Sequence, residues 1–344
     1  MITVLQPGLY TTIQDAGRTG YQRFGVPVAG AMDPFSAKLA NVLLGNEQGA
    51  AVLEFTALGP TLRFEQDTFF ALTGADFSPK LNGQRIRSNA AGFAPAGSVL
   101  ALGSADGGFR GYLAVLGGFD AARVMGSRST YVKAGLGGVE GRPLRKEDKL
   151  SVIASDRIPG QLEWRSIRKE NMPFYRTNDT AVVRVVPGPQ DDHFSAEGLD
   201  AFFSQPYTVT GESDRMGYRL EGALIPRAAG KEGNIISDGV AFGSIQVPDS
   251  QLPIVMMADR QTTGGYPKLG TVISADLCRM AQLRAGEKVR FVKVTLEEAH
   301  RALLEQRKFL RTLEAMYAGY MKTKKEMLLS IEEKQYTVEV TEIG

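Results

Sequence analysis

The segment VLEFTALGPTLRFEQDTFFAL, residues 52–72, decides the fold class of this chain. It holds three short runs, 52–56, 61–64 and 68–72, which are rich in β-branched and aromatic residues. Gly59-Pro60 separates the first two runs, and a short polar stretch separates the last two. Runs of four to eight such residues bounded by turn formers are typical of β-strands. The segment therefore predicts three consecutive strands.

Runs of the same kind continue to about residue 292 and predict a mainly β protein. They are 98–102, 111–116, 181–186, 207–210, 253–257 and 288–292. Their spacing, together with turns such as Leu81-Asn82-Gly83-Gln84, favours antiparallel sheets over parallel βαβ units. The 39 glycines fit many tight turns. One helix is expected at Ser36–Leu44, after Asp33-Pro34 and before Gly45.

The length of the chain, 344 residues, indicates two domains rather than one. The strand pattern weakens between about 155 and 180, a charged stretch that contains Trp164. We interpret this stretch as the connection between two β domains, packed on a neighbour rather than free. The expected limits are 1–165 for the first domain, 180–293 for the second and 295–344 for a C-terminal region.

The C-terminal region changes character at Thr295. Thr295-Leu296-Glu297-Glu298 has the spacing of a capping box, so a helix should begin there. One apolar face of that helix is predicted from Leu296, Ala299, Leu303, Leu310, Leu313, Tyr317 and Tyr320. Seven basic residues lie between Arg301 and Lys325, and a solvated helix face explains them more simply than an acidic partner. Residues 327–331 and 335–343 should form a terminal hairpin across Glu332-Glu333-Lys334.

Composition excludes several classes of function. The net charge is +2, which gives no overall field for nucleic acid or an anionic membrane, so neither is expected as a partner. No apolar run approaches the 18 or so residues of a membrane span, and the N-terminus lacks a leader pattern. A single cysteine, Cys278, rules out an internal disulfide and suits a reducing compartment. A cytoplasmic location is the expectation.

Standard catalytic motifs are missing from the sequence. No phosphate-binding loop of the G-x-x-x-x-G-K-[ST] type occurs, and the glycine run 135–141 suits a strand-end loop better than a dinucleotide site. The two histidines, His193 and His300, are too few for a multi-histidine metal centre, so no metal is expected. Cys278 is either a nucleophile or an inert buried thiol, and the inert interpretation is favoured.

Four loops share one polar composition: 11–33, 126–131, 213–219 and 258–271. Each loop offers amide or hydroxyl donors, and most add an arginine that could bind a carboxylate or a carboxylate that could transfer a proton. Any single loop is explained by residues that hold a turn. The recurrence of the same set in four loops favours a small-molecule site.

In their order along the chain, these loops resemble the KipA family, also called allophanate hydrolase subunit 2 or biotin-dependent carboxyltransferase-like. The similarity covers residues 3 to about 292. The strings that carry it include Thr12-Ile13-Gln14-Asp15, Gly30-Ala31-Met32-Asp33, Glu54-Phe55-Thr56, Thr73-Gly74-Ala75-Asp76, Gly126-Ser127-Arg128-Ser129-Thr130-Tyr131, Pro187-Gly188-Pro189-Gln190, Ser213-Asp214-Arg215-Met216-Gly217, Ile245-Gln246-Val247-Pro248, Gly264-Gly265-Tyr266-Pro267 and Arg279-Met280-Ala281-Gln282-Leu283.

The resemblance implies two cyclophilin-like β-barrel domains, followed here by the C-terminal helix and hairpin. It also implies an enzyme component that acts with a KipI-type B subunit and a LamB/YcsF-type A subunit as ATP-dependent 5-oxoprolinase. That complex cleaves 5-oxo-L-proline to L-glutamate with hydrolysis of ATP, which could bind at a subunit interface. Two alternatives stay open: a urea- or allophanate-type carboxyltransferase subunit, and a protein that binds and antagonises KipI in sporulation control.

The chain departs from the family at two points. The family more often has glycine before the aspartate where this chain has Glu147-Asp148, which is a variation within a turn. No Ala-Met-Lys-Met biotin attachment sequence occurs in the chain, so no biotin is expected on it.

Opening a lactam with ATP requires cations for the substrate carboxylate, donors for the amide oxygen and an acid or base for the ring nitrogen. Arg18 and Arg215 are the expected anion-binding residues. The amides of Gly264 and Gly265 with Thr262 or Thr263 are the expected oxyanion donors, and Asp259 or Asp33 is the expected acid/base. The remaining expected substrate contacts are Gln14, Asp15, Tyr21, Asp214, Gln246, Tyr266 and Lys268.

Overall fold

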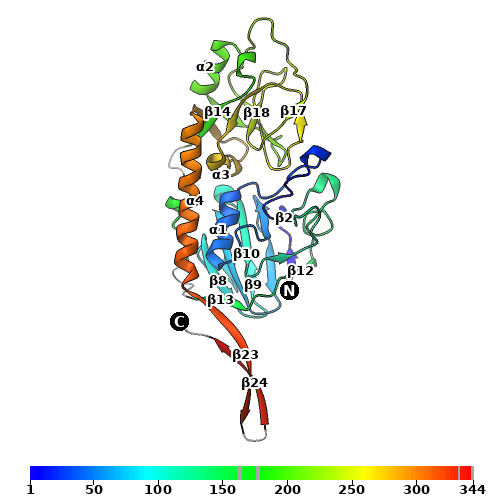
Figure 1. The fold of residues 1–344 in the computed structure, drawn as a ribbon, viewed down its shortest axis with the longest axis vertical. Helices are drawn as coiled ribbons and strands as arrows, with labels where there is room; N and C mark the ends of the chain where they lie inside the picture. The colour runs from blue at the N-terminus through cyan, green and yellow to red at the C-terminus, as the bar shows by residue number, and fades with distance from the viewer. Residues whose placement is uncertain (161–164, 176–178, 332–333, 342–344) are drawn as a thin grey trace.

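The computed structural model describes the whole chain except residues 161–164, 176–178, 332–333 and 342–344, and for residues 322–341 it describes the backbone alone. Trp164, the turn residues Glu332 and Glu333, and Ile343 lie outside the described residues. Figure 1 shows an elongated molecule, with one β unit above the other, a long helix along the side of both and a hairpin extending from the lower end.

The first half of the chain is a sandwich of two sheets. One sheet has the order β11 (Phe119–Asp120), β12 (Lys149–Val152), β1 (Ile2–Gln6), β4 (Thr61–Phe64), β9 (Val99–Ala101), β6 (Lys80–Leu81) and β7 (Gln84–Arg85). The other has the order β2 (Tyr10–Gln14), β3 (Val52–Thr56), β10 (Asp106–Val115), β5 (Thr68–Asp76) and β8 (Ala90–Ala94). The expected strands 52–56 and 61–64 are confirmed as β3 and β4, and the run 68–72 extends to Asp76.

Both faces of the five-stranded sheet are covered. Ile2, Phe55, Phe64, Phe70 and Leu113 belong to the core between the two sheets, where alternate strand residues point inward. The opposite face carries the helix α1 (Pro34–Leu44), which contributes buried leucines to a second core. The helix predicted at 36–44 is therefore confirmed. It begins two residues earlier because Asp33 caps it and Pro34 occupies its first turn.

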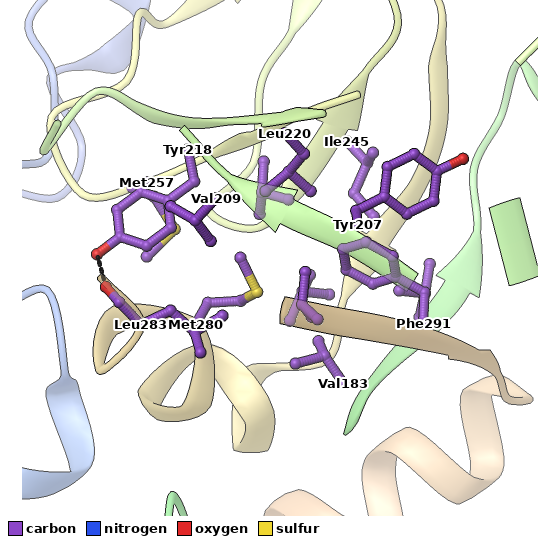
Figure 2. Close-up of a cluster of buried hydrophobic side chains, with 14 of the residues drawn as sticks. Val183, Tyr207, Val209, Tyr218, Leu220, Ile245, Met257, Met280, Leu283 and Phe291 are labelled. Atoms are coloured by element: carbon purple, nitrogen blue, oxygen red, sulfur yellow. Dashed lines mark hydrogen bonds between the residues drawn. The ribbon is translucent and has the colours of Figure 1, made fainter. Parts of the chain in front are cut away.

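The second half is a closed barrel. Its strands follow the order β14 (Thr180–Pro187), β21 (Lys268–Val272), β18 (Ser244–Gln246), β19 (Ile254–Met256), β16 (Gly217–Glu221), β15 (Pro206–Val209) and β22 (Lys288–Lys293). Figure 2 shows its aromatic and aliphatic core, in which the hydroxyl of Tyr218 donates to the Leu283 carbonyl at 3.2 Å. The helices α2 (Ala196–Ser204) and α3 (Leu277–Ala281) flank the barrel, and β17 (Asp238–Gly239) pairs with β20 (Thr263–Gly264) beside it.

Two expectations about the sheets need correction. The prediction of two barrels is confirmed for the second half alone, because the described strands of the first half form two separate sheets instead of one closed ring. The prediction of antiparallel pairing holds with one exception among the described strands: β14 and β22 pair in parallel, from Thr180 opposite Lys288 to Val185 opposite Lys293. The ends of the barrel sequence meet side by side in this pair, which contributes to closing the barrel.

The long helix α4 (Leu296–Ala318) has the predicted capping box, in which the Thr295 hydroxyl accepts from the Glu298 amide and the Glu298 carboxylate accepts from the Thr295 amide. Its buried face consists of Ala302, Leu310, Leu313 and Tyr317, whereas Leu296 is 70% exposed, so the predicted face is wrong at its start. The helix ends at Ala318, and Lys322, Lys324 and Lys325 lie on strand β23 instead.

The terminal hairpin is longer than predicted at its first strand. β23 spans Met321–Ile331 and β24 spans Lys334–Thr341. The hairpin is attached to the body through β13 (Arg157–Pro159), which pairs with β23 from Arg157 opposite Thr323. The strand pattern near the C-terminus therefore begins directly after α4. Its first half could not be recognised in the sequence because it contains several lysines.

The connecting stretch packs against the rest of the protein through a buried arginine, as expected. Arg165 is fully buried and donates to three carbonyls, those of Gly160 at 2.9 Å, Leu43 at 3.0 Å and Tyr317 at 3.1 Å. Its guanidinium also stacks on the Tyr317 ring at 4.9 Å. One buried side chain thus joins the connection to carbonyls in the last turns of α1 and α4, where few intrahelical donors are available.

The turn at Glu147-Asp148 has a backbone conformation that suits glycine better than glutamate. Glu147 adopts φ 70°, in the left-handed region that costs an L side chain roughly 1–2 kcal/mol. We therefore expect Glu147→Gly to raise the free energy of unfolding by up to about 1 kcal/mol, as measured by urea denaturation. Lys146→Gly is the matched control, since Lys146 has no positive φ and should gain nothing. A stabilisation shared by both variants would contradict this explanation.

Candidate functional site

A buried ion-pair cluster joins the sandwich to the barrel. Arg215 precedes β16, and its Nε and Nη2 donate to the two carboxylate oxygens of Asp259, each at 2.9 Å. Its Nη1 donates to Glu54 on β3 of the sandwich, and Nη2 also donates to the Gly30 carbonyl at 2.7 Å. Arg215, Asp259 and Glu54 are 8%, 7% and 1% exposed. Two loops predicted to form the site, 213–219 and 258–271, therefore meet in this cluster.

The neighbours of Arg215 keep it charged. Burial lowers the pKa of Arg215, but Asp259 and Glu54 more than offset this effect, so the pKa lies above its ordinary value. A planar guanidinium holding a carboxylate through two parallel hydrogen bonds is also a rigid unit. In this arrangement the donors of Arg215 are occupied by protein groups, which makes Arg215 a residue that positions the loops.

Glu54 is the residue of this cluster that sequence reasoning missed. Its Oε2 accepts from the Met32 amide and from the Tyr112 hydroxyl, both at 2.7 Å. The Tyr112 hydroxyl in turn accepts from the Asp33 amide at 2.8 Å. The signal was present in the run Val52–Thr56, because a carboxylate in the middle of an apolar strand must find a partner when it is buried.

Asp33, one of the two expected acid/base residues, caps α1. Its carboxylate accepts from the Ser36 amide at 2.9 Å and the Ser36 hydroxyl at 2.6 Å. Gln282 at the end of α3 donates to the same carboxylate at 2.9 Å. Burial raises the pKa of Asp33, and the Ser36 hydrogen bonds oppose that effect. Asp33 is fully buried and is occupied by capping and by the contact between α1 and α3.

Gln14 and Asp15 organise the loop 126–131. The Asp15 carboxylate accepts from the Ser127 hydroxyl at 2.6 Å, the Ser129 hydroxyl at 2.5 Å and the Arg128 amide at 2.6 Å. The buried Gln14 side chain donates to the Thr130 carbonyl at 3.1 Å. Its Oε1 has no hydrogen-bond partner among the described residues. The predicted juxtaposition of loops 11–33 and 126–131 is therefore present.

Arg18 is a buried cation whose donors are largely unused. It is 1% exposed, and its Nη2 donates to the Ser129 carbonyl. Within the described part of the chain, its Nε and Nη1 have no partner. Burial lowers the pKa of Arg18, while the carboxylates of Asp15 and Asp259 oppose this effect. The loop around it is close-packed: Gly137 has φ +66°, and a Cβ there would lie 2.1 Å from the Ser129 oxygen.

Three groups from different elements lie within electrostatic range of Asp259. Asp259 acts electrostatically on Arg18, on Tyr131 of the loop 126–131 and on Tyr10 at the start of β2. Burial raises the pKa of both tyrosines; Asp259 raises the pKa of Tyr131 further, whereas at Tyr10 the lowering by Arg215 exceeds the raising by Asp259. Asp259 is thus within electrostatic range of an arginine and two phenols. This set can bind an anion and donate hydrogen bonds to a polar substrate.

The remaining expected residues of loop 258–271 lie along the barrel beside β17 and β20. Gln246 is 2% exposed and accepts from Gln261 Nε2 at 3.2 Å, while its own Nε2 has no partner among the described residues. A Cβ at Gly264 would lie 2.4 Å from that nitrogen, so a larger residue there would require the Gln246 side chain to move. Lys268 is buried and donates to Asp238 at 2.9 Å. Thr262 is half-buried, and its carbonyl accepts from the Val240 amide.

Other expected contacts of the site are more exposed or serve turns. Thr263 and Tyr266 are exposed, and Gly265 is half-buried with its carbonyl accepting from the Ile235 amide at 2.8 Å. The Asp214 carboxylate accepts from the Met216 amide at 2.7 Å, which is a turn of the kind that aspartate favours. Tyr21 is half-buried, and its carbonyl accepts from the Phe24 amide.

Two further buried residues, Arg260 and Arg110, were not predicted from the sequence. Arg260, next to Asp259, is 7% exposed, and burial lowers its pKa to about 10 while Asp259 opposes the shift. It donates to the Val240 carbonyl at 3.0 Å. Arg110 on β10 donates to the Tyr218 hydroxyl and to the Ala281 carbonyl, which fixes the sandwich to the barrel. Neither arginine belongs to a motif, so its burial could not be foreseen from local pattern.

Cys278 behaves as a buried structural thiol. It is 1% exposed in α3, and its Sγ donates to the Ala275 carbonyl at 3.3 Å. Burial raises its pKa well above the ordinary value, which keeps it in the thiol form and argues against a nucleophile. His193 is half-buried and His300 is exposed on α4. Among the residues whose placement is described, no group of three or more His, Cys, Asp or Glu is arranged to hold a metal ion.

Comparison with known proteins decides the family. The family model described as "Carboxyltransferase domain, subdomain A and B" matches residues 24–293. The chain belongs to this carboxyltransferase family. The resemblance found from the loop strings is thereby confirmed. The matched region includes the barrel, the ion-pair cluster and most of the sandwich. The first two strands of the sandwich, β1 and β2, precede it.

Relatives cover nearly the whole chain. It is 38% identical over 313 residues to the 5-oxoprolinase C subunit of Escherichia coli (strain K12), and the match spans 91% of this chain and 97% of the relative. It is also 38% identical over 300 residues to the 5-oxoprolinase C subunit of Haemophilus influenzae, spanning 87% of this chain and 93% of the relative.

Solved structures share the carboxyltransferase fold. The Kluyveromyces lactis urea carboxylase aligns with 99% of this chain at a TM-score of 0.84 and 30% identity, although the match is 32% of that longer chain. The protein TTHA0988 aligns with 85% of this chain at a TM-score of 0.74 and 33% identity, covering 55% of its own length. Among the described residues, no helix is long and apolar enough to cross a membrane.

Proposed function

We propose that this chain is the C subunit of an ATP-dependent 5-oxoprolinase, which cleaves 5-oxo-L-proline to L-glutamate together with a KipI-type B subunit and a LamB/YcsF-type A subunit. The observation that carries this proposal is the 38% identity to two 5-oxoprolinase C subunits, over 97% and 93% of their lengths. Sequence similarity that extends over whole subunits supports a shared role better than a match to one domain.

The proposed substrate site lies at the junction of sandwich and barrel, around Arg18, Tyr10, Tyr131 and Asp259. In this proposal Arg18 binds the carboxylate of 5-oxoproline through an unpartnered nitrogen, Nε or Nη1, since a charge-assisted hydrogen bond is stronger than one between neutral groups. Arg215 instead holds Asp259 and Glu54 in place. The two arginines, which looked equivalent in the sequence, thus receive different roles.

Asp259 is the better placed of the two carboxylates proposed for proton transfer. Asp33 is fully buried and accepts three hydrogen bonds within the protein. Asp259 is 7% exposed and lies within electrostatic range of Arg18. Its ion pair with Arg215 uses one lone pair of each oxygen, which leaves a second on each for water or the ring nitrogen.

The barrel would supply the donors for the amide oxygen. We assign this role to the unpartnered Gln246 Nε2, the Gly264 and Gly265 amides and the hydroxyl of Thr262 or Thr263. A lactam oxygen becomes a leaving group once it is phosphorylated, so ATP must meet the substrate at the same place. We propose that ATP binds at an interface with one of the partner proteins, which completes the site, and that this chain carries no biotin. The protein would act in the cytoplasm.

Reconstitution with both partner proteins tests this function. We expect glutamate release that requires ATP, 5-oxoproline and all three chains, measured by coupled assay of glutamate and phosphate. The matched control omits this chain alone and should show no release. A complete assembly that binds tightly but releases no glutamate would contradict the proposal and favour a protein that only sequesters its KipI-type partner.

Carboxyl transfer is a second candidate, which the family match and the urea carboxylase structure favour. It predicts that the same preparation moves a carboxyl group from a carboxybiotinylated carrier protein to urea or a related amide. Radiolabelled bicarbonate, followed into an acid-stable or trapped carboxylated product, measures this transfer. Label in that product without glutamate release would replace the first function by the second.

A further inference from the structure

A cavity of about 340 Å³ lies where α1, α3 and α4 meet, apart from the cluster around Arg215. Its charged lining consists of Lys38 on α1 and Arg307 and Arg311 on α4. Ser274 and Gln48 contribute polar groups, and Phe35, Leu277, Leu303 and Leu310 contribute apolar ones. In Figure 1 these helices meet beside the junction of the two β units. The cavity therefore lies where a ligand could contact both halves of the molecule.

The charge in this cavity is unbalanced. None of the lining residues that the structure describes is acidic. Lys38, Arg307 and Arg311 take part in no ion pair or hydrogen bond within the described residues. Two carboxylates on neighbouring elements are engaged with other groups: Glu314 accepts from Gln48 Nε2 at 3.1 Å, and Asp276 binds Arg184 and Arg279.

The excess of positive charge makes the protonated form of Lys38 less favourable. Its side chain is half-buried, and burial lowers its pKa, with Arg307 lowering it further. A cation that is both desolvated and repelled by another cation is destabilising unless an anion neutralises it. All three cations nevertheless line the same open space, Lys38 half-buried and Arg307 and Arg311 exposed.

We infer that this cavity binds a small phosphate-bearing anion with a charge of two or three, of the size of pyrophosphate. Three cations from two helices suit such a ligand. The guanidinium of arginine can donate two hydrogen bonds to phosphate oxygens, and the lysine ammonium adds a localised positive charge. The volume is near the lower end of ligand pockets, which usually measure about 300–1,000 Å³, so a whole nucleotide would not be enclosed. This inference is independent of the proposed catalytic function.

Binding would tie the two β units together. α4 packs on α1 of the sandwich through Leu310 and Leu313, and its first turns pack on the barrel through Ala302 next to Ala275. An anion held by Lys38 and Arg307 would remove the repulsion between α1 and α4 at that crossing. The bound anion would thereby stiffen the junction at which the proposed substrate site lies.

Calorimetric titration of the intact chain with inorganic pyrophosphate tests the inference. We expect saturable binding with one site per chain, weakened roughly tenfold or more by Lys38→Gln or Arg307→Gln, because each removes a charge-assisted contact. Lys308→Gln and Arg301→Gln are the matched controls, since both remove a charge from exposed positions of α4 that do not line the cavity. These controls should bind as the parent protein does.

Thermal unfolding guards against a folding artefact. Lys38→Gln should melt at or above the temperature of the parent protein without ligand, and pyrophosphate should raise the melting temperature of the parent but not of this variant. Absence of saturable binding, or equal weakening by the lining and control variants, would overturn the inference. Citrate binding as tightly as pyrophosphate would overturn the assignment to phosphate.

Discussion

Replacing Arg215 by methionine should lower the free energy of unfolding by about 3–5 kcal/mol, the typical cost of removing one partner from a buried ion pair. The variant would leave the carboxylates of Asp259 and Glu54, at 7% and 1% exposure, without the cation that forms an ion pair with both. It would also remove the donor to the Gly30 carbonyl. Chemical denaturation followed by circular dichroism measures the loss.

Arg219→Met is the matched control for this prediction. Arg219 lies four residues further along, its side chain is 55% exposed, and its contact with Glu212 at 3.7 Å is on the surface. Its substitution should change stability by no more than about 0.5 kcal/mol. Adding Asp259→Asn and Glu54→Gln to Arg215→Met should restore part of the stability, because the uncompensated charges are then removed. A loss below about 1 kcal/mol for Arg215→Met alone would show that the cluster does not hold the two halves together.

Local sequence pattern predicted the strands and helices well where one rule applied. The run Val52–Thr56 is a strand with the same limits, and Thr295 caps a helix as its spacing required. The pattern failed where two signals overlapped. The lysines of 322–325 suggested a solvated continuation of the helix, whereas pairing with β13 makes them part of a strand. Strand pairing over such a distance in the sequence leaves no local trace.

The site could be predicted only as a set of loops. Loops 11–33, 126–131, 213–219 and 258–271 do meet, through the hydrogen bonds of Asp15, Gln14 and Arg215. The sequence could not show which arginine has free donors, because that depends on partners such as Glu54, which lies 161 residues before Arg215 in the chain. Asp33 and Asp259 likewise looked alike until the capping of α1 was seen to occupy Asp33.

Replacing Arg18 by methionine should reduce kcat/KM for 5-oxoproline by about 10²–10³-fold in the reconstituted enzyme, if Arg18 binds the substrate carboxylate as proposed. Stability should stay unchanged or rise, because the guanidinium is buried, two of its nitrogens have no described partner, and burial lowers its pKa. Parallel measurements of glutamate release and of thermal unfolding separate the two effects. Arg18→Lys should recover part of the activity, since it restores the charge without the planar guanidinium.

Arg23→Met provides the control for Arg18→Met, because Arg23 lies in the same loop region but is exposed and packs over Phe24 at 4.8 Å. It should leave both kcat/KM and stability close to those of the parent protein. The opposite pattern, a large loss of stability with normal turnover for Arg18→Met, would mean that Arg18 serves only to hold the Ser129 carbonyl and its loop. The substrate carboxylate would then have to be bound by another residue, of this chain or of a partner protein. A kcat that falls without any change in KM would point instead to a contact made mainly in the transition state.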